Sequence, residues 1–255
     1  MSVSDGAIAD AAAAIREADS VVAMSGAGVS TASGIPDFRG EDGLWETHDP
    51  MDFHIDRFRA DPEGFWADRV ELQDVIFADG DVQPNAAHEA FADLEASGRL
   101  DALITQNIDG LHQDAGSEEV IEIHGSAARV VCQDCRHRFD ADDAFERAKG
   151  GELPPTCGEC EDGVLKPDTV LFGEQLPEHA LMKSHAKAQN ADVFVVAGSS
   201  LTVEPAASLP REAAQRGATL VLANLESTPL SGSAEFDFRA DVTDVLPRLR
   251  DAVLE

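Results

Sequence analysis

Residues 21–40 read Val-Val-Ala-Met-Ser-Gly-Ala-Gly-Val-Ser-Thr-Ala-Ser-Gly-Ile-Pro-Asp-Phe-Arg-Gly, and this stretch decides the fold. An apolar, β-branched run that leads into a Gly-x-Gly turn is typical of a doubly wound sheet, which presents backbone N–H groups to a pyrophosphate. Gly26 and Gly28 permit the tight turn and a close approach of the ligand, but Thr31 stands where the third glycine of the dinucleotide motif belongs. The following Asp37-Phe38-Arg39 suits a ligand with charged, flat and hydroxylated parts.

Further apolar runs alternate with helical patterns along the chain. The sequence predicts strands at 20–24, 101–105, 120–123, 193–197 and 219–223 and helices at 7–18, 84–97, after 200 to about 216, and 244–254. Because continuously apolar strands alternate with helices, we expect an α/β fold with a Rossmann-like, doubly wound parallel sheet covered on both faces. Polar clusters follow the strand ends at 26–39, 106–109, 198–200 and 224–226. Ligands bind at the carboxyl edge of such sheets, so these clusters should converge on one crevice.

Two regions interrupt this pattern. Residues 41–80 carry aromatic side chains at irregular helical spacing, and we expect a helical insert that forms a lobe over the cofactor turn. Residues 126–165 carry all four cysteines and should form a small zinc-ribbon domain. The Rossmann-like domain then comprises residues 1–40, 81–125 and 166–255.

The cysteines form two Cys-x-x-Cys pairs, Cys132/Cys135 and Cys157/Cys160. Residues 136–156 separate the pairs, slightly more than the roughly 15–20 residues usual in zinc ribbons. Each pair aims two thiolates at one point, and four protein ligands leave no open position, so we expect one structural Zn²⁺. A redox dithiol or disulfides are the alternatives, and a cytoplasmic location disfavours disulfides.

The composition is strongly acidic. Nineteen basic against 49 acidic residues give a formal charge of −30, with the acids spread along the whole chain. Such a surface repels nucleic acid and anionic membranes, and the cysteine insert is itself net acidic, so we expect no nucleic-acid binding despite the zinc ribbon. Self-repulsion on this scale favours a salt-rich, halophilic cytosol, with an acidic mesophilic protein as the alternative. Neither a signal peptide nor a stretch of roughly 20 apolar residues is present, so we expect a cytoplasmic protein that does not bind membranes.

Several stretches together resemble the sirtuins, the NAD-dependent protein lysine deacylases. They are Gly26–Gly40, Thr105–Asp109, His124-Gly125, the four cysteines, Lys166–Glu174, Gly198–Ala206 and Asn224–Glu226. No single motif is decisive, but they occur in the family's order and cover the chain from about residue 5 to its end.

The resemblance implies that the enzyme releases nicotinamide from NAD and transfers the acetyl group of an acetylated protein lysine onto ADP-ribose. It also implies a set of cofactor-binding positions: Gly26, Ala27, Gly28, Asp37, Phe38, Arg39, Gln106, Asn107, Ile108, Asp109, Gly198, Ser199, Ser200, Asn224, Leu225, Glu226 and Val242. Residues 26–28, Arg39 and 198–200 would bind the phosphates. Asp37, Phe38 and 106–109 would surround the nicotinamide and its ribose, and 224–226 would bind the adenosine.

His124 and Asn107 are the expected catalytic residues. A histidine titrates near neutrality, so His124 can take a proton from a ribose hydroxyl, which then attacks the acyl-imidate carbon. Asn107 would hold the ribose and orient water. His88 and His112 are expected to be structural.

The substrate strand implied by the resemblance is Val170-Leu171-Phe172-Gly173-Glu174, which would pair with an acyl-lysine peptide, with Phe172 lining the lysine tunnel. Lys166 and Asp168 depart from the family's usual residues. Relatives that remove succinyl or malonyl groups use a Tyr-x-x-Arg pair, and this chain contains no tyrosine. We therefore expect acetyl or other uncharged acyl groups as substrates.

Two other functions remain open from the sequence. A mono-ADP-ribosyltransferase or NAD hydrolase would share the cofactor turn and His124 but would not need the substrate strand. A non-catalytic NAD sensor or zinc-ribbon interaction protein would not need Asn107, Asp109 and His124.

Overall fold

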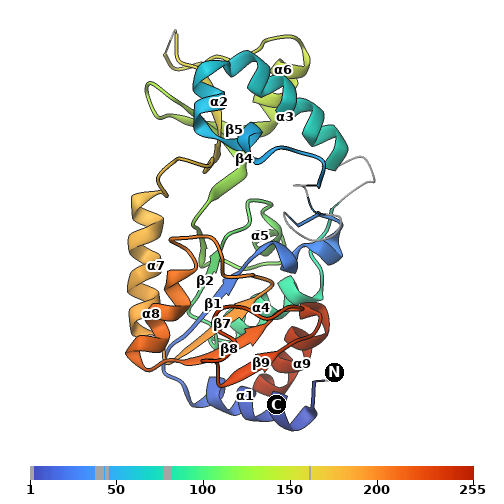
Figure 1. Cartoon of the computed structure of the whole chain (residues 1–255), viewed down its shortest axis with the longest axis vertical. Helices are drawn as coiled ribbons and strands as arrows, with labels where there is room; N and C mark the ends of the chain where they lie inside the picture. Colours follow the sequence, from blue (N-terminus) through green and yellow to red (C-terminus); the bar gives the residue numbers. More distant parts are fainter. Residues whose placement is uncertain (1–2, 38–42, 44–45, 77–81, 161) are drawn as a thin grey trace.

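A six-stranded parallel sheet forms the larger of two lobes in the computed structural model, which describes residues 3–37, 43, 46–76, 82–160 and 162–255 (Figure 1). Its strand order is β3-β2-β1-β7-β8-β9. The strands are β1 Val21–Ser25, β2 Ala102–Thr105, β3 Val120–Glu122, β7 Val193–Ala197, β8 Thr219–Ala223 and β9 Phe236–Phe238. Because β1 pairs with both β2 and β7, the strand order reverses at β1, which confirms the predicted Rossmann-like fold.

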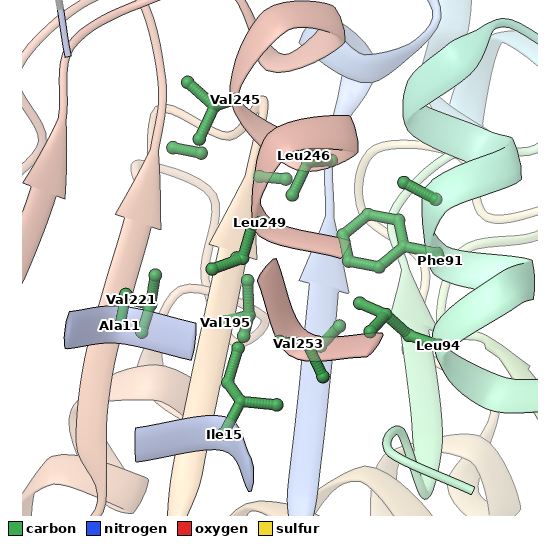
Figure 2. Packing of buried hydrophobic residues seen from close by; sticks show 14 of the residues in the cluster. Ala11, Ile15, Phe91, Leu94, Val195, Val221, Val245, Leu246, Leu249 and Val253 are labelled. Atoms are coloured by element: carbon green, nitrogen blue, oxygen red, sulfur yellow. The ribbon is translucent and has the colours of Figure 1, made fainter. Parts of the chain in front are cut away.

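Helices cover both faces of this sheet. Helices α1 (Asp5–Glu17), α4 (Ala86–Ala96) and α9 (Val242–Leu254) pack on one face, where Figure 2 shows Ile15, Phe91 and Leu249 in the core. Helices α7 (Glu178–Asn190) and α8 (Ser208–Arg216) cover the other face. All five residues of β1 and of β7 are buried, as expected for central strands of a covered parallel sheet.

Side-chain caps fix the starts of α1 and α9. The Ser4 hydroxyl accepts a hydrogen bond from the N–H of Ala7, and the Asp241 carboxylate accepts one from Thr243. Each cap satisfies a backbone donor that has no partner within the first helical turn.

The smaller lobe is a three-stranded antiparallel sheet with helices packed on it. Its strands are β4 (Gly125–Cys132), β5 (Arg138–Asp140) and β6 (Leu165–Thr169), in the order β5-β4-β6. Helices α2 (Ile55–Ala60), α3 (Pro62–Ile76) and α6 (Ala141–Lys149) belong to this lobe (Figure 1). Buried Phe65 and Trp66 of α3 share one hydrophobic cluster with Val130 and Leu165 of the sheet. The helices of 41–80 and the cysteine insert therefore share one core.

Shorter helical segments complete the fold. They are the 3-10 helices η1 (Ala27–Val29), η2 (Thr31–Ser33) and η4 (Pro50–Phe53), and the single turn α5 (Leu111–Asp114). Among the described residues, no helix has the length and apolarity that crossing a bilayer requires.

Candidate active site

Two glycine-containing loops meet at the point where the strand order reverses. The N–H of Gly28 donates to the carbonyl of Gly198 at 2.9 Å, and the N–H of Gly26 donates to Ala197 O at 3.0 Å. A Cβ on Gly28 would lie 3.0 Å from Cα of Gly198, and one on Gly198 (φ +59°) would lie 2.4 Å from the Val29 nitrogen. Glycine is therefore needed at these positions because the loops that follow β1 and β7 are in contact. This requirement is separate from the close approach of a ligand that the sequence predicts.

The polar side chains that follow β2 form a connected network at this crevice. Asn107 Nδ2 donates to the hydroxyl of Ser30 at 3.0 Å and to the carbonyl of Gly26 at 3.2 Å. The Ser30 hydroxyl in turn donates to Asp109 Oδ2 at 2.7 Å. Gln106 Nε2 donates to Ser199 Oγ at 2.8 Å. The structure thus brings three of the predicted residues of the β2 loop together with both phosphate-loop candidates.

His124 lies at the end of β3, next to the β2 loop. Its Nδ1 is 2.9 Å from the carbonyl oxygen of Gln106. A carbonyl only accepts hydrogen bonds, so Nδ1 carries the proton and Nε2 has its lone pair available. Burial lowers the pKa of His124 below 6.5, against the opposing effect of the bond to Gln106 O, so the ring is neutral at pH 7. No hydrogen bond to Nε2 is found among the described residues.

The other predicted cofactor residues occupy varied environments. Ser199 is buried, whereas Ser200 is exposed and lies 3.0 Å from Thr202 Oγ1. Asn224 Nδ2 donates to the carbonyl of Glu226 at 3.0 Å, and Leu225 is 70 % exposed. Val242 is buried in the core at the first turn of α9.

The remaining predictions concern the β1 loop and its neighbours. Asp37 is half-buried. Phe38 and Arg39 lie outside the described residues. Ile108 is half-buried, and its carbonyl accepts a hydrogen bond from Ala127 N.

The predicted substrate segment 170–174 follows β6 and starts beside His124. Val170 N donates to the carbonyl of His124 at 2.8 Å, which ties the start of the segment to the candidate base. Phe172 pairs with 53–55: its N–H donates to Phe53 O and its carbonyl accepts from Ile55 N. The Phe172 side chain is 43 % exposed.

The four cysteines converge at the far end of the small lobe. Their sulfur atoms all lie within 4.8 Å of one another, with 3.5 Å between Cys132 and Cys160 and 3.6 Å between Cys135 and Cys157. A tetrahedral zinc with Zn–S bonds of about 2.3 Å separates its sulfurs by about 3.8 Å, so the arrangement fits the predicted ion. A Cβ on Gly163 would lie 2.4 Å from the Cys132 sulfur, so a glycine is needed beside the cluster.

Sequence reasoning left two groups of buried polar residues without a role. Ser25 and Thr105 lie at the ends of neighbouring strands, and their hydroxyl oxygens are 2.8 Å apart. His88 and His112 pack against each other with ring centroids 4.8 Å apart. All four are buried, and Ser25 also contacts His112. Ser25 and Thr105 are each the last, polar residue of an otherwise apolar strand and directly precede a polar motif, and this pattern could have marked them in the sequence.

A protein-family model described as the Sir2 family matches residues 26–205. The chain belongs to the Sir2 family. An NAD-dependent protein deacetylase from Haloarcula marismortui is 56 % identical over 247 residues, covering 96 % of this chain and 94 % of that protein. This match confirms the sirtuin resemblance and the predicted enzyme class.

Solved Sir2 structures share the whole architecture. A Sir2 homologue in complex with NAD superposes with a TM-score of 0.85 at 40 % identity, covering 96 % of this chain and 93 % of that one. A second, containing a deacetylated p53 peptide and 3′-O-acetyl ADP ribose, has a TM-score of 0.84 at 35 % identity and covers 95 % of this chain and 96 % of that one. These Sir2 structures support the predicted cofactor, NAD.

Proposed function

We propose that this Sir2 protein removes acetyl groups from protein lysines in a reaction that consumes NAD, with His124 as the general base. The observation that carries the proposal is the tautomer of His124. The Gln106 carbonyl holds the proton on Nδ1, and burial keeps the ring neutral, so Nε2 is ready to accept a proton.

The polar network gives each neighbouring residue a distinct task. The candidate cofactor residues would hold NAD, and its nicotinamide-bearing ribose carbon would supply the electrophile when the cofactor is bound. Asp109, held by Ser30, would accept from the carboxamide N–H₂ of nicotinamide. Asn107, held by Ser30 and Gly26 O, would fix the ribose beside the acetyl oxygen. His124 then activates the ribose hydroxyl that captures the acyl carbon. The loops at 26–28, 198–200 and 224–226 would bind the phosphates and adenosine.

Products identify this reaction. Purified enzyme, NAD and an acetyl-lysine peptide should yield the deacetylated peptide, nicotinamide and O-acetyl-ADP-ribose by mass spectrometry. His124→Ala should lower product formation by at least about a hundredfold, the size typical of a lost general base. His179→Ala is the matched control, because His179 is exposed on α7. ADP-ribosylated protein or free ADP-ribose as the main product would instead identify a transferase or an NAD hydrolase.

The acyl preference follows from the composition. The chain has no tyrosine to hold an acyl carboxylate and a formal charge of −30 that repels one. Acetyl peptides should therefore react faster than succinyl peptides of the same sequence, and basic peptides should be favoured at low salt. Faster desuccinylation would refute this assignment.

We assign the enzyme to a salt-rich cytoplasm. Its surface charge supports this location, and the 56 % identical relative comes from a halophile. No aspartate or glutamate among the described residues is fully buried.

A further inference from the structure

A buried chain of hydrogen bonds starts at His112 and ends at the backbone of Asn107. His112 Nε2 lies 2.8 Å from Ser25 Oγ, and the Ser25 hydroxyl donates to Thr105 Oγ1 at 2.8 Å. Thr105 Oγ1 also accepts the N–H of Asn107 at 3.1 Å. His112, Ser25 and Thr105 are at most 3 % exposed.

The proton positions along this chain follow from the partners. Ser25 has one proton and gives it to Thr105, so it accepts from an N–H at His112 Nε2. The opposite nitrogen, Nδ1, is buried without a partner among the described residues. A bare acceptor nitrogen is tolerated there more readily than an orphaned N–H. Burial lowers the pKa of His112 to about 3, which agrees with a permanently neutral ring.

His88 reaches the side chain of Asn107 through Ser30. Its Nδ1 accepts the N–H of Asn85 at 3.2 Å, so Nε2 carries the proton and faces Ser30 Oγ at 3.4 Å. Ser30 also accepts from Asn107 Nδ2. The two imidazoles, which pack against each other at an interplanar angle of 59°, thus reach Asn107 at its side chain and at its backbone.

We propose that His112 is a positioning residue for deacetylation: through Ser25 and Thr105 it fixes the backbone at Asn107 and so the amide that holds the ribose. The inference rests on the proposed function. His112 touches no reacting atom, so its loss should misplace Asn107 and slow the chemical step while leaving substrate binding intact.

Two substitutions at one position test this role. His112→Phe keeps a ring against His88 and Phe91 but removes the donor, whereas His112→Gln keeps an N–H at similar reach. We expect His112→Phe to lower kcat by about ten- to a hundredfold, with the KM values for NAD and peptide changed less than about twofold. His112→Gln should restore most of kcat. Equal kcat for His112→Phe and the parent, or equal losses in both variants, would overturn the inference.

Ser25→Ala tests the same chain without changing the histidine. It should reproduce the kcat loss, and combining it with His112→Phe should add little, because both break one chain. Fully additive losses would mean that the two residues act separately and would overturn the inference. If the parent enzyme forms no O-acetyl-ADP-ribose, the proposed function is overturned as well. If the parent is active, a negative result with the variants overturns only the role of His112.

Discussion

At the scale of single residues, the proposed role of His124 as general base predicts how activity depends on pH. The base must be neutral, and burial lowers its pKa below 6.5. Activity should therefore fall as pH is lowered, with its half-maximal point below pH 6.5. The measurement is kcat for O-acetyl-ADP-ribose formation from pH 5 to 9 at constant ionic strength. An inflection above pH 7 assigned to this step would contradict the argument.

Candidate site residues could be picked out from the sequence where their type is diagnostic and their spacing is local. The Cys-x-x-Cys pairs and the His124-Gly125 motif are such cases. The role of Ser25 was not predictable, because its partners Thr105 and His112 are 80 and 87 positions away in the chain. A hydroxyl has no spacing signature, so only the fold shows what it bonds.

At the scale of elements, regular periodicity was enough for the central strands. The predicted bounds of β7 and β8 agree with the structure. Helix α7 was missed, because only Ser184 and Ala188 of its residues are buried and no apolar stripe marks its face. Strand β9 was missed because three residues are too short to show alternation.

One buried lysine, Lys166 of β6, bonds to both ends of the stretch that runs from β6 through the substrate segment. Lys166 Nζ donates to the carbonyls of Pro167 and Thr169 at 2.8 Å and lies 3.1 Å from Glu174 Oε2. That carboxylate also accepts Leu171 N at 2.8 Å. Burial lowers the pKa of Lys166, and Glu174 opposes this shift. The ammonium therefore closes the turn that leads into the segment.

Removing this ammonium should loosen the substrate segment. Lys166→Met leaves Glu174 without its partner, so we expect a loss of about 2–4 kcal/mol in unfolding free energy and a higher KM for the peptide. Lys166→Arg is the charge-conserving control. The double variant with Glu174→Gln should regain part of the stability, because no unpaired charge then remains. Urea titrations and peptide saturation curves measure both effects; an unchanged peptide KM would argue against the coupling.

At the scale of the whole molecule, the net charge governs stability. Unscreened repulsion among 49 acidic residues opposes the folded state, and the Debye length shrinks from about 10 Å at 0.1 M salt to about 3 Å at 1 M. The melting temperature should rise steadily between 0.1 and 2 M KCl. A melting temperature that does not change with KCl would contradict this prediction and indicate an acidic protein that is not adapted to high salt.

Strand β4 connects the candidate base to the cysteine cluster. It starts at Gly125, beside His124, and ends at Cys132 in the thiolate cluster, roughly 20 Å away at the rise of an extended strand. Removing zinc should free the Cys132 end of β4. Because Gly125 pairs with Thr169 at the other end of the strand, the change should also displace the neighbouring His124 imidazole. A chelator should therefore inhibit the enzyme as it would a metallohydrolase, although the zinc does not contact the substrate. Assays with a chelator should include a fluorescence probe that reports unfolding of the small lobe.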